Sequence, residues 1–285
     1  MKKISILLIA ALASQARAGE IYNIWQGREM PGAVSEKPED KTPRTIKYCN
    51  TPTLEIHPSK TGKSNGFVIV CPGGAYQCLC RTYEGDDIAE ALAERGISAG
   101  VLLYRVPKNK SGALMDAHRA IRFVRANAAK LGVDPNKVAI MGFSAGGNLS
   151  ARTSAPATYA PADGIDKQPE VPNAIGLIYP AYIDAFHEDG QHLKKNPETD
   201  YSKRYAPATN IKISADMPPV FIVSSQEDIC VDASIAQYLA MKREGARATL
   251  LLFDKGKHGF GIRDKKNLNC EWIDLYAKWL KLEGF

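Results

Sequence analysis

Two hydrophobic patterns alternate along the chain. Short continuous apolar runs predict strands buried on both faces, and stretches with an apolar residue every three or four positions predict helices with one buried face. We predict strands at 54–57, 67–71, 97–106, 138–141, 173–179, 220–223 and 249–253. Regular alternation of such strands with helices is typical of an α/β domain, in which helices cover both faces of a mainly parallel sheet.

The helical pattern is clearest after Asp116, where apolar residues recur on one face until Gly132 ends the stretch. His118 lies in this helix among three arginines, so we interpret it as a surface or packing residue rather than a catalytic base. Asp232 is predicted to cap a later helix. The other predicted helices begin just after 144 or cover 86–94 and 272–280.

The first eighteen residues have the pattern of a secretory signal peptide. A basic start, Met1-Lys2-Lys3, precedes an apolar core at 4–12 and the sequence Ala16-Arg17-Ala18. We predict cleavage after Ala18 and export to the periplasm or the medium. Residues 19–285 are then expected to form a single domain, because no repeat or linker divides them.

Two polar stretches interrupt the alternation. Residues 19–45 are rich in Pro, Glu and Lys and are predicted to form a loosely ordered arm with one edge strand. Residues 183–210 contain charges and two histidines without periodicity. We predict that they form an insertion over the sheet near the active site, where such loops often contact the substrate.

The charge balance and the cysteines narrow the choice of partners. A net charge of +6, part of it on the predicted signal peptide, is too mild to indicate a nucleic-acid-binding protein. No other stretch approaches the roughly 20 apolar residues that would span a membrane. Disulfides are possible among the six cysteines of an exported chain, although Cys71 is predicted to be a buried free thiol. We predict no metal at Cys78-Leu79-Cys80, because no further histidine or cysteine accompanies it.

The stretch 137–150 contains the strongest chemical signal in the chain. An apolar run leads into Gly142-Phe143-Ser144-Ala145-Gly146, which has the form G-x-S-x-G, and small residues follow that could open a helix. A serine at such a strand-to-helix turn has a strained backbone and an exposed hydroxyl. The flanking glycines are needed because a Cβ there would collide with a neighbouring strand or helix. We interpret Ser144 as a nucleophile rather than as part of an ordinary turn.

A second glycine-rich loop, Pro72-Gly73-Gly74-Ala75-Tyr76, follows the strand predicted at 67–71. Glycines there leave backbone N–H groups uncovered, and such a loop supplies an oxyanion donor in enzymes with the serine turn. The alternative interpretation is a tight turn without a catalytic role.

A serine nucleophile needs a base, and the base needs an orienting acid. His258 directly follows the last predicted strand, and Asp228 follows the strand before it. The order Ser, Asp, His is the one expected for this kind of turn. Glu227 and Asp184 remain alternatives to Asp228 as the acid.

These stretches together resemble the α/β-hydrolase superfamily and, within it, exported bacterial carbohydrate acetylesterases of the acetyl xylan esterase type. Supporting stretches are Tyr83-Glu84-Gly85, 116–122 and Met217-Pro218-Pro219. The resemblance implies a three-layer α/β-hydrolase fold and the roles of nucleophile, base and acid for Ser144, His258 and Asp228. It also implies an oxyanion hole made by backbone N–H groups of Ala145 and of Ala75 or Gly74, and no metal or organic cofactor. Related lipase-like esterases have His-Gly-Gly-Gly where this chain has 72–75.

The expected activity is hydrolysis of short acyl esters, most of all acetyl groups on plant or algal polysaccharides. Phenolic esters such as feruloyl groups, or peptides, are alternative substrates, because Tyr76, Tyr182 and Tyr201 could stack on an aromatic acyl group. Sugar stacking or core packing explains the same tyrosines equally well. A catalytically silent binding module on the same fold is the remaining alternative.

Overall fold

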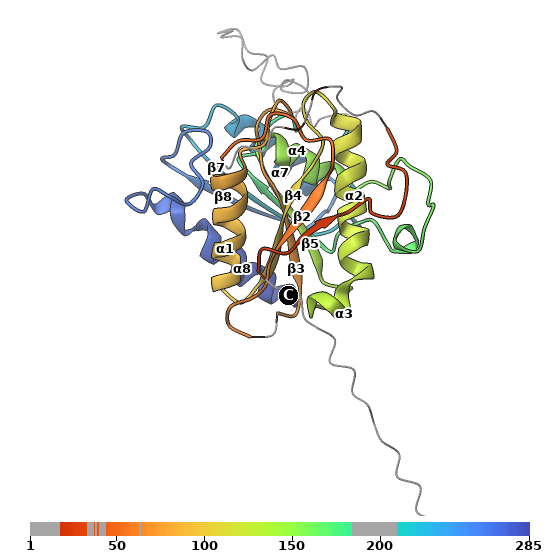
Figure 1. The fold of residues 1–285 in the computed structure, drawn as a ribbon. Coiled ribbons are helices and arrows are strands. Elements are labelled where there is room, and N and C mark those ends of the chain that lie inside the picture. The colour runs from red at the N-terminus through yellow and green to blue at the C-terminus, as the bar shows by residue number, and fades with distance from the viewer. Residues whose placement is uncertain (1–17, 33–36, 38, 40–43, 63, 184–209) are drawn as a thin grey trace, which may run out of the picture.

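In a computed structural model, which describes residues 18–32, 37, 39, 44–62, 64–183 and 210–285, eight strands form one sheet (Figure 1). The strands are β1 (Ile21–Asn23), β2 (Thr53–His57), β3 (Phe67–Cys71), β4 (Ser98–Leu103), β5 (Val138–Phe143), β6 (Ala174–Ile178), β7 (Val220–Ser225) and β8 (Ala248–Phe253). Their order across the sheet is β1-β2-β4-β3-β5-β6-β7-β8. The β1–β2 and β2–β4 pairings are antiparallel, and every pairing from β4 across to β8 is parallel.

Helices cover both faces of this sheet, as the hydrophobic pattern predicts (Figure 1). Their buried side chains fall into two cores, one with α1 and α8 and the other with α2, α4 and α7. The helices are α1 (Asp87–Glu94), α2 (Lys110–Ala126), α3 (Ala128–Leu131), α4 (Ala145–Arg152), α7 (Val231–Arg243) and α8 (Trp272–Leu282). Shorter turns are η1 (Thr82–Asp86), which is π-helical, and the 3₁₀ turns η2 (Ile165–Lys167) and η4 (Leu268–Glu271).

The parallel strands place their carboxyl ends at one edge of the sheet. All residues of β3, β5, β6 and β7 are buried, which explains their continuous apolar sequences. β5 lies between β3 and β6, so the loop after β5 is flanked by the loops after its two neighbours. The glycine-rich loop after β3 and the serine turn after β5 therefore meet at this edge.

Several predicted boundaries were wrong. The predicted helix at Asp116 begins at Lys110, where the Asn109 side chain accepts a hydrogen bond from the Gly112 N–H and so caps the first turn. It ends at Ala126, and a separate turn, α3, runs up to Gly132. The strand predicted at 97–106 ends at Leu103. Residues 184–209 of the predicted insertion and 1–17 of the predicted signal peptide lie outside the described residues.

The N-terminal arm is better packed than predicted. β1 is the expected edge strand, but Ile24 and Trp25 directly after it lie in the core with the α2 face. The Trp25 indole N–H donates to Asp116 Oδ1 at 2.7 Å, and Arg105 pairs with the same buried carboxylate. The arm therefore closes one side of the α2 layer.

The arginines of α2 are buried rather than solvated. Arg119 donates to Asp163 and Asp166, and Arg122 donates to Glu170, so acidic groups from the 160–170 loop neutralise this face of the helix. His118 is fully buried between these arginines, which confirms a packing role. Burial lowers the His118 pKa to about 4, so the imidazole is neutral at physiological pH.

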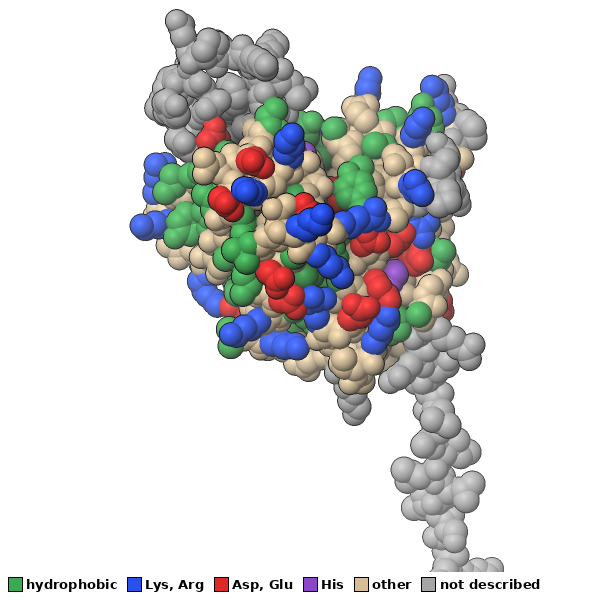
Figure 2. Space-filling view, turned by 90° about the vertical axis from the view of Figure 1, so that its left-hand side faces the viewer, with side chains coloured by type: hydrophobic (Ala, Val, Ile, Leu, Met, Phe, Trp, Pro, Cys, Tyr) green, Lys and Arg blue, Asp and Glu red, His purple; other side chains and the backbone are tan. Residues whose placement is uncertain are grey.

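The face covered by α1 and α8 carries surface charges of both signs. Basic and acidic side chains are interspersed there (Figure 2), and Arg95 of the α1 C-terminus pairs with Asp274 of α8 at 2.7 Å. None of the six cysteines, all of which lie in the described part of the chain, forms a disulfide, and Cys71 is buried as predicted. Within the described residues, no helix has both the length and the apolar character that a membrane crossing requires.

Candidate active site

Ser144 occupies the sharp turn between β5 and α4. Its backbone has φ 50° and ψ −117°, a conformation that is strained for a residue with a Cβ. A Cβ on Gly142 would lie 1.9 Å from the Gly146 carbonyl oxygen, and one on Gly146 would lie 2.2 Å from the Cys71 carbonyl oxygen. Both glycines are therefore required for the close approach of α4 to the sheet, for the steric reason that the sequence indicates.

The structure brings the three predicted side chains together. His258 Nε2 lies 2.8 Å from Ser144 Oγ, and His258 Nδ1 lies 2.9 Å from Asp228 Oδ1. Ser144 follows β5, Asp228 follows β7, and His258 follows β8, so all three come from loops at the carboxyl edge of the sheet. A hydrogen-bonded chain of this kind can activate a serine hydroxyl through an imidazole.

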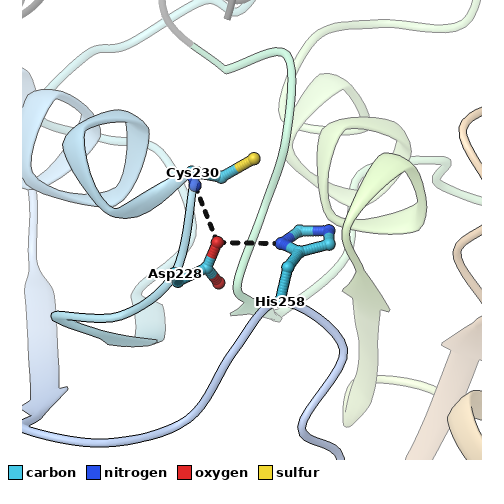
Figure 3. A group of neighbouring side chains, drawn as sticks. All are labelled: Asp228, Cys230 and His258. Carbon is cyan, nitrogen blue, oxygen red and sulfur yellow. Dashed lines mark hydrogen bonds and ion pairs between the residues drawn. The ribbon is translucent and has the colours of Figure 1, made fainter. Parts of the chain in front are cut away.

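Asp228 lies beside the imidazole (Figure 3). Its side chain is fully buried, and Oδ1 accepts hydrogen bonds from both His258 Nδ1–H and the backbone N–H of Cys230 at 2.7 Å. Among the described residues, Oδ2 has no hydrogen-bond partner. The His258 side chain is 30% exposed, so the ring faces the solvent while its orienting acid does not.

The electrostatic surroundings make His258 a stronger base. Burial alone would lower its pKa, but the hydrogen bond and negative charge of Asp228 raise it above the ordinary value, and the charge of Glu84 adds to the effect. The carboxylates thereby favour the protonated form of the imidazole.

Among the other acidic residues of this region, the structure places Glu227 and Asp232. Glu227 accepts a hydrogen bond from the Gly256 N–H at 3.0 Å and so supports the loop that holds His258. Asp232 lies in the first turn of α7, whose N-cap position is Cys230, so the prediction that Asp232 caps this helix was wrong. Asp184 lies outside the described residues.

The loop after β3 lies directly against the serine. A Cβ built on Gly73 would be 2.9 Å from Ser144 Cβ, and one on Gly74 would be 2.1 Å from the Cys78 carbonyl oxygen. Gly74 has φ +131°, and Ala75 adopts a left-handed φ of 54° despite its methyl group. Glycine is thus required at 73 and 74 by close approach and backbone conformation.

The predicted oxyanion donors have no competing backbone acceptor. No backbone carbonyl in the described part of the chain accepts the N–H of Gly74 or Ala75. Ala145 is the first residue of α4, so its N–H has no acceptor within the helix. Gly73 differs, because its N–H donates to the Glu84 carboxylate at 2.8 Å.

Two residues beside the site were not predicted to take part in it. Glu84 is 2% exposed and accepts hydrogen bonds from the Gly73 N–H and, at 3.0 Å, from the Tyr179 hydroxyl. The Tyr179 ring in turn packs edge-on against the His258 ring, with centroids 5.3 Å apart. Glu84 lies in a stretch that carries the family resemblance, but its partners are separated from it in sequence and could not be inferred.

Of the tyrosines considered for stacking on an aromatic substrate, Tyr76 has another role. Tyr76 is 2% exposed, and its hydroxyl donates to Asn148 Oδ1 at 2.8 Å, so it is a core residue. Tyr182 is half-buried against Tyr76, with Lys110 Nζ 4.9 Å from its ring centroid. Tyr201 lies outside the described residues.

The imidazole and two side chains beside it could hold a metal ion. Ligand atoms of Asp228, Cys230 and His258, which we call the Asp–Cys–His cluster, lie within 4.8 Å of one another (Figure 3). However, Asp228 Oδ1 and His258 Nδ1 are already bonded to each other. An ion bound at this cluster would compete with that bond, so the geometry fits an inhibitory ion better than a resident cofactor.

A polar pocket of about 380 Å³ borders His258 on the loop between β8 and η4. It contains charged groups of both signs, amides and one aromatic ring, a composition suited to hydrogen bonding with sugar hydroxyls. Its lining includes Glu227, Lys255, Lys257, Phe260, Asp264, Asn267 and Asn269.

Comparison with known proteins shows where this geometry belongs. A family model described as the alpha/beta hydrolase fold matches residues 73–262, which include the loop after β3, the serine turn and both partners of the serine. The chain belongs to the α/β-hydrolase family. The sheet order, the two helical layers and the serine turn of this α/β hydrolase agree with that assignment.

The relatives of this α/β hydrolase include enzymes named for xylan chemistry. An acetylxylan esterase of Xylanibacter ruminicola is 30% identical over 76% of this chain. The crystal structure of an acetyl ester-xyloside bifunctional hydrolase from Caldicellulosiruptor lactoaceticus covers 97% of this chain and 99% of its own, with 28% identity and a TM-score of 0.76. A propionate-bound esterase of Thermogutta terrifontis covers 82% of this chain and 90% of its own, with 28% identity and a TM-score of 0.66. This chain spans less than half (46%) of the Xylanibacter ruminicola enzyme.

Proposed function

We propose that this α/β hydrolase is a serine esterase that removes acetyl groups from xylan-type polysaccharides or oligosaccharides. The single observation that carries the esterase chemistry is the position of His258, hydrogen-bonded to Ser144 Oγ on one side and to Asp228 on the other. An imidazole held in this way can remove the serine proton and later return it to the leaving group.

The proposed reaction has two halves. Ser144 Oγ attacks the ester carbonyl while His258 Nε2 takes its proton, and the C–O bond to the sugar breaks as His258 protonates the departing sugar hydroxyl. The acetyl group is then an ester of Ser144. Water attacks this ester with His258 again as base, which releases acetate and restores the serine hydroxyl.

Backbone N–H groups of Gly74 or Ala75 and of Ala145 are proposed to stabilise the negative oxygen of each tetrahedral intermediate. Gly74 and Ala75 lie on the loop after β3 and Ala145 directly follows the serine, and no backbone carbonyl of the described residues competes for the N–H groups of Gly74 and Ala75. Fixed donors of this kind are typically worth about 3 kcal/mol each in transition-state stabilisation.

The choice of substrate rests on relatives and on the site surface. Two of the relatives are named for acetylated xylan or for an acetyl ester-xyloside, and a third binds propionate, a short acyl product. The pocket beside His258 is lined mainly by charged and polar residues, and the charged side chains Lys255 and Lys257 could bind sugar hydroxyls. Phenolic esters are less well supported, because Tyr76 is buried in the core rather than available for stacking.

Export remains part of the proposal. The signal-peptide pattern at 1–18 would bring the enzyme to the compartment in which polymeric xylan is found. Mass spectrometry of the protein secreted by a bacterial host should show a mature N-terminus at Gly19; a processed chain that begins elsewhere, or a retained Met1, would contradict this.

The substrate assignment is tested by the release of acetate from acetylated xylan, with methyl ferulate and an aminoacyl anilide as alternative substrates. We expect the acetylated xylan to be hydrolysed fastest. Ser144→Ala should abolish turnover of all substrates with little change in the thermal transition, because Oγ is not part of the core packing. Retained turnover in this variant would refute the serine mechanism, and faster turnover of the ferulate or anilide would refute the substrate class.

A further inference from the structure

A buried carboxylate that the proposed mechanism does not use lies directly beneath the reacting groups. We infer that Glu84 is a positioning residue, which fixes the oxyanion loop through Gly73 and the catalytic imidazole through Tyr179. This inference rests on the proposed esterase function and extends it to the groups that hold the site in shape.

The first contact fixes the loop after β3. Glu84 Oε2 accepts the Gly73 N–H at 2.8 Å, and a Cβ on Gly73 would lie 2.7 Å from this oxygen and 2.9 Å from Ser144 Cβ. Gly73 is therefore confined between the carboxylate and the nucleophile. The next two N–H groups in the chain are the proposed oxyanion donors of Gly74 and Ala75, so their direction depends on how Gly73 is held.

The second contact fixes the imidazole. Glu84 Oε1 accepts the Tyr179 hydroxyl at 3.0 Å, and the Tyr179 ring meets the His258 ring at an interplanar angle of 66°. Tyr179 is fully buried and has a φ of 36°, an uncommon conformation for an aromatic residue. A residue in such a conformation persists only where its surroundings hold it, and the Glu84 bond is one of these restraints.

The local fold explains why Glu84 can reach both partners. It lies in the π-helical turn η1, directly before α1, and the glycine that follows it allows this turn to approach the sheet. A Cβ on Gly85 would lie 2.8 Å from Val101 Cγ1 and 3.2 Å from Pro72 Cγ. Single π-helical turns of this kind are frequent at functional sites.

The charge of Glu84 also acts on His258. Burial raises the Glu84 pKa to about 7, against the opposing effects of the Gly73 and Tyr179 hydrogen bonds and the His258 charge. The other titratable groups that interact with Glu84 have raised pKa values and are neutral at pH 5–9: Cys78, Cys80, Tyr83, Tyr104 and Tyr179. His258 is thus the one described group whose charge changes together with that of Glu84 near neutral pH.

Glu84→Gln separates this role from a merely structural one. One amide oxygen cannot accept both hydrogen bonds, and the negative charge is lost. We expect kcat/KM for p-nitrophenyl acetate at pH 8 to fall roughly 10- to 100-fold. We also expect the acidic limb of the pH profile of kcat/KM to move to lower pH by roughly half a unit. The reason is that the negative charge of Glu84, which raises the pKa of His258, is absent in this variant. Tyr179→Phe should lower kcat less, with the limb close to its wild-type position, because the carboxylate and the ring remain.

The control is Glu94→Gln, which removes an exposed carboxylate of the same helix region and should leave both kcat/KM and the profile unchanged. If Glu84→Gln fails to fold, Glu84→Asp replaces it. The shorter side chain keeps the negative charge but withdraws the carboxylate from Gly73. We therefore expect kcat to fall while the acidic limb of the pH profile keeps its wild-type position.

A Glu84→Gln enzyme with wild-type kcat/KM and profile, or one that loses activity with the limb unmoved, would overturn the inference, as would a wild-type kcat in Glu84→Asp. A wild-type protein that does not hydrolyse acetyl esters would instead refute the proposed function.

Discussion

The substitution Asp228→Asn isolates the contribution of one negative charge to the site. In many serine enzymes this change reverses the tautomer of the histidine and lowers kcat by about 10⁴. Here Asp228 Oδ1 accepts two N–H groups, whereas Oδ2 has no partner among the described residues. The amide oxygen should therefore keep the place of Oδ1, with the new NH₂ group in the place of Oδ2, so that the histidine keeps its orientation.

The expected fall in kcat then reflects the removal of the negative charge of Asp228 alone. Replacing a charge-assisted hydrogen bond to the imidazolium by a neutral one should weaken transition-state stabilisation by about 2–3 kcal/mol, which corresponds to a fall of about 30- to 150-fold in kcat. Because Asp228 raises the His258 pKa against the effect of burial, the acidic limb should also move to lower pH. The assay is the pH dependence of p-nitrophenyl acetate hydrolysis, with Asp232→Asn, a carboxylate of the adjacent helix, as the control.

Two results would refute this reasoning. An unchanged kcat would show that Asp228 does not act on His258 during the reaction. A fall near 10⁴-fold would show that the amide NH₂ faces the imidazole, and hence that the unpartnered position of Oδ2 does not decide the orientation.

Three further predictions concern stability and inhibition. Gly146→Ala should lower the free energy of unfolding by roughly 2–3 kcal/mol in urea titrations, because its Cβ would lie 2.2 Å from a backbone oxygen of β3. The control is Gly164→Ala, whose Cβ would have nothing within 4 Å, and it should leave the free energy of unfolding unchanged. The pKa of Glu84 is about 7 in the folded protein and about 4.5 in the unfolded chain. Between these values the folded protein binds more protons, so the free energy of unfolding should fall by up to about 3 kcal/mol as the pH rises from 4.5 to 7. This component should be absent from the pH dependence of unfolding in Glu84→Gln, and an identical pH dependence in both proteins would contradict it. Zn²⁺ should inhibit hydrolysis by binding at the Asp–Cys–His cluster, and EDTA should restore activity. Cys230→Ser should weaken this inhibition. Equal inhibition of the variant and the wild-type protein would show that the ion binds elsewhere.

The strands and the grouping of Ser144, Asp228 and His258 were predictable because each has a local signal. β3, β5, β6 and β7 are buried on both faces, so nearly every residue in them is apolar. The serine turn requires glycine at fixed positions, since any Cβ would strike backbone atoms. Asp228 and His258 were found from their order and their position after strands, and the parallel sheet brings such loops to one edge.

Features that depend on distant partners were not predictable in this way. The arginines of α2 have the sequence of a solvated surface, yet Arg119 is fully buried because Asp163 and Asp166, more than forty residues later, neutralise it. Glu84 carries no local signal for its contacts with Gly73 and Tyr179, which lie in loops that follow different strands of the sheet. The start of α2 was misplaced because a capping side chain, rather than an apolar residue, defines its first turn.

The central claim is that Ser144 carries the acyl group during turnover, and covalent labelling tests it most directly. After incubation with a fluorophosphonate, peptide mapping by mass spectrometry should find one adduct, on the peptide that contains Ser144, with loss of esterase activity in proportion to labelling. Ser144→Ala should remain unlabelled. An adduct on a different residue, or full activity in a completely labelled protein, would contradict the account.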